Sequence, residues 1–258
     1  MNKNVIKICK SFIKEILEKE DWFRQLVNDK ACDLLLLTGT ATEQTKDVFS
    51  DIDIFLVCKY DAQVKYSLKP VQIYKHKGEV FEISILSTEK LFNDKYHKES
   101  IHWWHHTYII KSYNKEAVKA LSRASRLTKK EFLDRLWTNF VYFKINTADI
   151  EKQIKRKEPL SVKLLFNENI KLVIDSELVC NGEFPSWKQF GRVLQRIDKN
   201  LYGKILEVQN FNDFKELWDN NTQLQSHIIK ILKDNGFPID EINNWENCNL
   251  ERITFQYR

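Results

Sequence analysis

The sequence predicts an α+β fold: an N-terminal domain with a mixed β-sheet, residues 1–110, followed by an all-α helical-bundle domain, residues 111–258. Two observations predict it. Short apolar runs of the β-strand type and one helical pattern share the chain up to about Ile110, whereas helical periodicity alone continues from about Asn114. With 258 residues, 43% of them hydrophobic, the chain can bury the core of one large domain or of two smaller ones.

The N-terminal domain is predicted to begin with a helix and two strands. Apolar residues recur at helical spacing from Val5 to Leu17 and predict an amphipathic helix. The apolar run Cys32–Thr38 predicts a buried strand that feeds a turn at Gly39. Beyond a polar stretch, residues 52–57 predict a second strand.

A hairpin and the start of a helix complete this domain. Residues 71–76 and 80–86 have strand patterns and are separated by Lys77-Gly78, which predicts a β-hairpin. The following Ser87-Thr88-Glu89 has the composition of a helix N-terminus.

Four helices are predicted in the C-terminal domain. Thr128-Lys129-Lys130-Glu131 is a capping-box sequence that opens the first of them. The second begins at about Leu160 and ends at Asn181-Gly182, where glycine suits a left-handed cap. The third opens at Pro185, and the fourth extends over about residues 212–236.

Composition predicts a soluble cytoplasmic protein. The N-terminal twenty residues are charged throughout and do not resemble a secretory signal, and no apolar run is long enough for a membrane span. Five cysteines are scattered without CxxC spacing, which favours buried, reduced thiols over disulfides or zinc.

The net charge of +5 is unevenly divided. Residues 1–110 hold 16 basic and 16 acidic residues, so the whole excess lies in residues 111–258. An excess of this size can hold a triphosphate, but it is too small and too diffuse to indicate duplex nucleic acid.

Asp51 and Asp53 are the most informative residues in the chain. Residues two apart in a strand point to the same face, so both carboxylates leave one side of the strand that contains Ile52, Ile54 and Leu56. At about 6 Å and an effective dielectric of about 20, two anions repel by roughly 3 kcal/mol. Such a pair is typical of a Mg²⁺ site, because Mg²⁺ takes one or two carboxylates together with phosphate oxygens.

Three further residues are predicted to belong to the same site. Gly39 at the end of the preceding strand lets backbone N–H groups approach a phosphate, and the Thr40 hydroxyl can donate as well. Glu82 interrupts an apolar strand and shares parity with Val80 and Ser84, so it offers a third carboxylate away from the core.

This constellation resembles the nucleotidyltransferase superfamily, whose fold is that of the polymerase-β palm. The matching pattern is Gly39-Thr40, ten intervening residues, Asp51-Ile52-Asp53, and then Glu82 on a later strand. Residues 78–94, GEVFEISILSTEKLFND, are similar to a segment of the antibiotic nucleotidyltransferases that modify kanamycin, and the chain length and helical C-terminal half also suit the lincosamide enzymes. The resemblance covers about residues 30–95 strongly, and it implies a nucleotidyltransferase-like N-terminal domain followed by a helical domain for substrate binding or dimerisation.

The resemblance implies an enzyme that transfers a nucleoside monophosphate, AMP from ATP, to a hydroxyl group and releases pyrophosphate. Asp51, Asp53 and Glu82 would be catalytic residues and ligands of a two-metal Mg²⁺ site, with Glu82 as either base or metal ligand. Gly39 and Thr40 would grip the β- and γ-phosphates. Lys188, a lone lysine after the Pro185 turn, is more often solvated, but the resemblance makes it a third nucleotide-binding residue.

The expected acceptor is a small molecule with a hydroxyl group, an antibiotic such as a lincosamide or an aminoglycoside, which implies a role in antibiotic resistance. The net basic charge of the helical half favours a less charged acceptor over a polycation. Two alternative functions stay open: an AMP-transferring antitoxin-like protein that acts on a macromolecule, and a catalytically inactive nucleotide-binding or interaction module. A homodimer is also open as the assembly.

A histidine-rich stretch lies at the end of the N-terminal domain. His97, His102, His105 and His106 accompany Trp103 and Trp104, and neither a cysteine nor a fixed helical context for an HxxxH pair supports zinc. We interpret the stretch as surface or interdomain packing.

Overall fold

The computed structural model describes residues 3–42, 50–59, 62–66, 69–93, 101–102, 104–185, 187–211 and 213–247. The chain divides into two compact units, Met1–Leu127 and Thr128–Arg258, here called the sheet unit and the helical unit. The sheet unit contains a five-stranded mixed sheet, and the described part of the helical unit contains helices and turns only. The predicted α+β class is therefore confirmed.

The sheet has the strand order β3-β4-β2-β1-β5. β2 and β4 run parallel, and the other three neighbouring pairs are antiparallel. The predicted strands and hairpin are confirmed to within two residues. The bounds are β1 Cys32–Thr38, β2 Ile52–Cys58, β3 Val71–His76, β4 Glu79–Ser87 and β5 Tyr108–Ser112.

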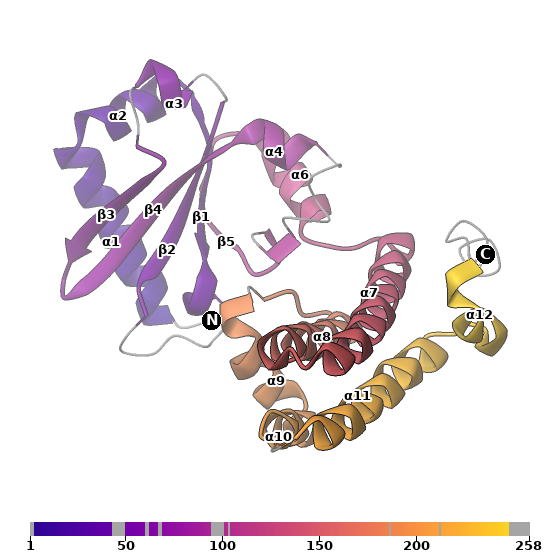
Figure 1. Ribbon diagram of the computed structural model, residues 1–258. Coiled ribbons are helices and arrows are strands. Elements are labelled where there is room, and N and C mark those ends of the chain that lie inside the picture. Colours follow the sequence, from indigo (N-terminus) through magenta and orange to yellow (C-terminus); the bar gives the residue numbers. More distant parts are fainter. Residues whose placement is uncertain are drawn as a thin grey trace. The chain divides into compact units, whose positions relative to one another are not determined.

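The sheet carries helices on both of its faces, as Figure 1 shows. On one face, here called the α1 face, lie α1 (Lys3–Lys19) and α2 (Asp21–Asn28). Phe12 of α1 stacks on Phe81 of β4, with ring centroids 3.9 Å apart. The buried residues that fill this side come from every second position of the strands, among them Leu35, Leu37, Ile52, Ile54, Leu56, Phe81 and Ile83.

The opposite face, here called the carboxylate face, is covered over only part of its area. Leu34, Leu36 and Val57 pack there against Trp104 and against two helices, α4 (Thr88–Phe92) and α6 (Lys115–Ala124). Ser87 caps α4 as predicted, since its hydroxyl accepts a hydrogen bond from the Glu89 N–H. The short elements α3 (Ala62–Lys65) and η1 (Gly39–Ala41) belong to connections between strands.

A β-bulge in β1 turns a buried carboxylate toward α4 and α6. The register slips between Cys32 and Leu34, so Cys32 packs on the α1 face whereas Leu34 packs on the other. Asp33 is buried and accepts hydrogen bonds from the Thr88 hydroxyl at 2.5 Å and from the Asn114 side chain at 2.8 Å. This contact ties α6 to the sheet unit, and the boundary predicted after residue 110 falls inside β5.

The helical unit is built around two long antiparallel helices. Thr128 and Glu131 form the predicted capping box at the start of α7. The prediction of a single helix that opens at Pro185 is wrong, because two helices follow. Asp198 ends the first of them, and its side chain caps the second. The bounds are α7 Lys129–Arg156, α8 Pro159–Cys180, η3 Trp187–Gln189, α9 Phe190–Ile197, α10 Lys199–Val208, α11 Phe214–Asp234, α12 Ile239–Asn243 and η4 Trp245–Asn247.

Polar contacts connect the helices of this unit. Arg135 of α7 donates two hydrogen bonds to Asp175 of α8, at 2.9 Å from Nε and 2.6 Å from Nη2. Thr147, Asn169 and Asn221 form a second hydrogen-bonded group that joins α7, α8 and α11 in the core. The acidic side chain of Asp175 is thus occupied by a structural contact.

Two predictions from composition can be compared with the structure. In the part of the chain that is described, no helix is both long enough and apolar enough to cross a bilayer. Cys9, Cys32 and Cys58 are buried thiols, as predicted, whereas Cys180 is exposed. Cys248 lies outside the described residues.

Candidate functional site

The structure brings Asp51, Asp53 and Glu82 together on the carboxylate face. Each of the three offers a carboxylate oxygen within 4.8 Å of the others. Asp53 and Glu82 are direct neighbours across the parallel β2–β4 ladder, and Asp51 immediately precedes β2. The three carboxylates predicted from the sequence therefore form one cluster.

Strand alternation explains why these side chains point away from the core. Ile52 and Ile54 on β2, like Phe81 and Ile83 on β4, are fully buried on the α1 face. The intervening residues point to the other face, where the three acidic side chains are partly exposed. The strand parity predicted for Glu82 is confirmed by this pattern.

The cluster concentrates negative charge. At 4.8 Å and an effective dielectric of about 20, each pair of ionised carboxylates repels by roughly 3 kcal/mol. Among the described residues, no lysine or arginine forms an ion pair with Asp51 or Glu82. Ser84 donates a hydrogen bond to Glu82 Oε1 at 3.3 Å, which fixes one oxygen of that side chain. A bound cation would remove most of the repulsion.

Gly39 forms the turn that lies directly against the Asp53 side chain. Its φ of +67° lies in the left-handed region, where a side chain is strained. A Cβ built on Gly39 would also overlap the Asp53 carboxylate and lie 3.0 Å from the carboxyl carbon. Glycine is therefore required here both for the turn after β1 and for the position that Asp53 occupies. Thr42 closes the turn, since its backbone N–H and its hydroxyl both donate to the Gly39 carbonyl, at 3.0 and 2.9 Å.

Thr40, next to this glycine, carries a hydroxyl that is buried at the start of the turn. The residue is buried, and its Oγ1 atom has no hydrogen-bond partner among the described residues. A buried hydroxyl without a hydrogen bond is unfavourable by about 1–3 kcal/mol, so an oxygen-rich ligand that reached it would restore a favourable contact. Residues 43–49, which follow the turn, lie outside the described residues.

These residues suit a divalent cation together with a phosphate group. Three clustered carboxylates are the hard oxygen ligands that Mg²⁺ takes, and Mg²⁺ commonly binds one or two of them plus phosphate oxygens. The glycine turn and the buried Thr40 hydroxyl are the kind of groups that approach a phosphate. The donor set and the glycine turn beside it therefore fit the metal and the ligand that the sequence predicts.

Lys188 belongs to the other unit. It lies exposed on η3 of the helical unit, whereas the carboxylate cluster lies in the sheet unit. Its role in nucleotide binding stays a prediction.

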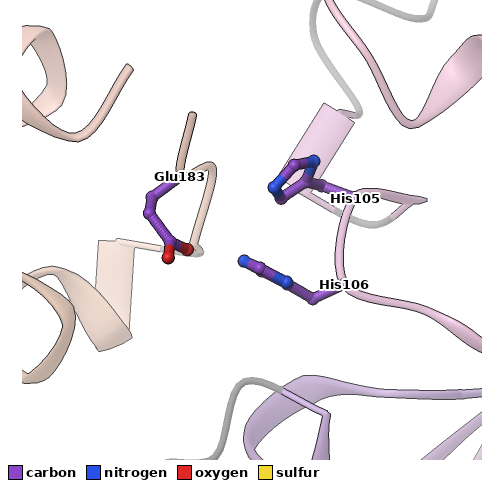
Figure 2. Close-up of side chains that lie close together, drawn as sticks. All are labelled: His105, His106 and Glu183. Carbon is purple, nitrogen blue, oxygen red and sulfur yellow. The ribbon is translucent and has the colours of Figure 1, made fainter. Parts of the chain in front are cut away.

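The histidine-rich stretch is described in part. The side chains of His105 and His106 lie close together, as Figure 2 shows. Their ring centroids are 4.3 Å apart, and the angle between the ring planes is 71°. His105 Nδ1 lies 2.9 Å from the carbonyl oxygen of Ser125, which accepts the hydrogen bond. Trp104 is fully buried, in agreement with the packing interpretation, while His97 and Trp103 lie outside the described residues. Glu183, labelled in the same view, belongs to the helical unit.

Two residues of the carboxylate face, Ser84 and Asp33, have roles that the sequence pattern did not indicate. Ser84 contacts Glu82, and its position two residues along the same strand is a signal that could have indicated this. Asp33, inside the apolar run of β1, holds α4 and α6 on the carboxylate face. A buried acid in an apolar strand does signal a polar partner, but the sequence does not show which one.

Comparison with known proteins gives structural likenesses but no match in sequence. No family model matches the chain, and no curated protein matches it in sequence. A solved structure of a nucleotidyltransferase-like protein from Exiguobacterium sibiricum aligns over 89% of this chain and 75% of that chain, with 9% sequence identity and a TM-score of 0.46. At that level the likeness carries no functional argument, and the proposal below rests on the geometry of the site.

Proposed function

We propose that the chain is a Mg²⁺-dependent nucleotidyltransferase that moves AMP from ATP to a hydroxyl group of a small molecule. The observation that carries the proposal is the cluster of Asp51, Asp53 and Glu82, whose carboxylate oxygens lie within 4.8 Å of one another beside the Gly39 turn. A site of this kind combines the ligands of a divalent cation with room for a phosphate.

The roles follow from the positions of the residues. Asp51 and Asp53 would hold Mg²⁺, with Glu82 available as a ligand of a second ion. When bound, the ions would supply positive charge to the triphosphate and lower the pKa of the attacking hydroxyl. The Gly39 turn and the Thr40 hydroxyl would bind the β- and γ-phosphates.

The chemical step exchanges one oxygen–phosphorus bond for another. The acceptor oxygen forms a bond to the α-phosphorus, the bond from that phosphorus to the bridging oxygen of the β-phosphate breaks, and pyrophosphate leaves. The hydroxyl proton goes to Glu82 where that side chain acts as the base, or to solvent where it acts only as a metal ligand. Lys188 is a further candidate for phosphate binding, and an antibiotic such as a lincosamide or an aminoglycoside is the acceptor class that the family resemblance favours.

Calorimetry with a non-hydrolysable ATP analogue tests the proposal. We expect binding that depends on Mg²⁺ in the wild-type protein, and turnover that falls more than about 100-fold in Asp53→Asn, because the amide is a poorer metal ligand. Asp21→Asn, an equal change on the exposed surface of α2, is the matched control and should leave both quantities unaltered. Screening hydroxyl compounds for pyrophosphate release identifies the acceptor.

Glu82→Gln separates the two roles of that residue. As a base it should preserve affinity for the analogue and slow turnover by roughly 10²–10⁴-fold. As a metal ligand only, it should weaken Mg²⁺-dependent binding, and a higher Mg²⁺ concentration should restore the rate. Absence of Mg²⁺-dependent nucleotide binding in the wild type would contradict the proposal, whereas binding without turnover across the screen would favour the inactive module.

A further inference from the structure

The carboxylate face ends at the β3–β4 hairpin, which exposes three β-branched apolar side chains. Val71 and Ile73 on β3 and Val80 on β4 are 44%, 68% and 38% exposed. β3 is the edge of the sheet, and its alternate residues Gln72, Tyr74 and His76 face the α1 side, where His76 is buried and Tyr74 packs against the core. The exposure is therefore a property of one face of this hairpin and not of the strand as a whole.

The exposed apolar residues adjoin the carboxylate cluster directly. Ile73 is the cross-strand partner of Glu82, and Val71 is the partner of Ser84, which donates to Glu82. Val80 lies two residues before Glu82 on the same face. Single exposed apolar residues are common on protein surfaces, but three that surround one functional carboxylate form a patch.

The ladder orders these groups in one row across the sheet. Thr38 pairs with Asp53, Asp53 with Glu82, and Glu82 with Ile73. Neighbouring strands lie about 4.8 Å apart, so the row extends over about 14 Å from the Gly39 side to the β3 edge. The carboxylates occupy its middle.

The geometry of in-line transfer indicates which end of this row receives the pyrophosphate and which end receives the acceptor. The attacking and leaving oxygens lie on opposite sides of the phosphorus, so with pyrophosphate at the Gly39 turn the acceptor must approach from the β3 side. There it meets Glu82 first and then Ile73, Val71 and Val80. We propose that this patch binds the apolar part of the acceptor, and that the acceptor is a small hydroxyl compound with an alkyl or aromatic face. This inference rests on the proposed function, because it takes the direction of transfer from it.

Methyl NMR on the full chain tests the patch without requiring turnover. The probes are hexyl β-D-glucoside, kept below its micelle concentration, and glucose, which has the same hydroxyls without the alkyl chain. With Mg²⁺ and the ATP analogue present, we expect the glucoside to shift the methyl signals of Ile73 and Val80, and glucose to leave them in place. Absence of a shift with the glucoside would overturn the inference.

Two variants locate the binding. Ile73→Thr keeps a β-branched residue but removes apolar surface, and it should weaken glucoside binding about 5- to 10-fold. Leu160→Gln changes a side chain of matching exposure, 69%, on α8 and should leave that affinity unchanged. Affinity for the analogue should be the same in wild type and Ile73→Thr; weaker analogue binding in Ile73→Thr would assign the patch to the nucleotide base and overturn the inference.

Two readouts separate this inference from the function on which it rests. If the analogue fails to bind in every variant, the proposed function fails, and the glucoside titration still reports on the patch. If the Ile73 signal shifts with protein concentration and not with the glucoside, the patch is a contact between two copies of the chain, and the assignment to the acceptor is wrong.

Discussion

The two faces of the five-stranded sheet carry side chains from the same strands, yet they differ in what covers them. On the α1 face, apolar residues pack under α1 and α2 as far as the edge strand, where His76 is still buried. On the carboxylate face the cover consists of Trp104, α4 and α6, and the part with Asp53, Glu82 and Ile73 stays partly or largely exposed. One face is therefore packed over its whole width, and the other carries the candidate site beside a smaller packed region.

Adjacent residues of β4 provide the strongest test of this contrast. Phe81 is fully buried on the α1 face and stacks on Phe12, whereas Val80 points to the other face. We expect Phe81→Ala to lower the free energy of unfolding of the sheet unit by about 3–5 kcal/mol. Val80→Thr should change it by less than about 0.5 kcal/mol. Hydrogen exchange of the β1 and β2 amides measures both, and similar losses in the two variants would disprove the contrast.

An intermediate effect is expected where the carboxylate face meets the Gly39 turn. Gly39→Ala should lower the free energy of unfolding by about 1–3 kcal/mol, because φ is positive and the new methyl group overlaps the Asp53 carboxylate. In an Asp53→Ala background the overlap is absent and only the backbone cost of about 1 kcal/mol should remain. A double-mutant cycle by chemical denaturation measures the coupling. Additive effects would mean that Gly39 serves the turn alone.

A small effect at neutral pH is expected at Tyr113, which packs against the core of the α1 face. Its hydroxyl is buried without a hydrogen-bond partner among the described residues, and burial raises the pKa of Tyr113 to about 12. Because the folded state holds this proton more tightly than the unfolded chain does, the contribution is complete below about pH 10 and is lost as pH rises toward 12. Tyr113→Phe should alter stability at neutral pH by no more than about 1 kcal/mol and should reduce this alkaline loss.

Unfolding free energies measured at about pH 9 and about pH 11 for wild type and Tyr113→Phe give the comparison. An equal loss in both proteins would assign the alkaline sensitivity to another group.

Much of the sheet could be predicted because its signals are local. The run from Cys32 to Thr38 is apolar and ends at a glycine, and the observed strand has the same bounds. Alternation along β4 predicted that Glu82 points away from the face on which Phe81 is buried, and the observed burial of β4 agrees. The proximity of the three carboxylates followed from this parity together with the resemblance to a known constellation.

The rest depends on contacts between distant segments. The strand from Tyr108 to Ser112 was missed because it is short and acquires its identity by pairing with β1. α6 has the apolar spacing of a bundle helix, so its place in the sheet unit depends on its distant contacts with Asp33 and with Leu34 and Leu36 of β1. The overlap between a side chain at position 39 and Asp53 depends on a φ angle and a register that no local pattern gives.

The buried Asp33 has a consequence for how the sheet unit forms and opens. It bonds to Thr88 and Asn114, which lie 55 and 81 residues away along the chain, and these are the first residue of α4 and the N-cap of α6. Neither helix can be anchored until β1 is in place, so both should close late during folding, after long loops have been ordered. In the native state α4 and α6 should also open together. The hydrogen-exchange protection of their backbone amides should therefore match that of the β1 amides and differ from that of the α7 amides.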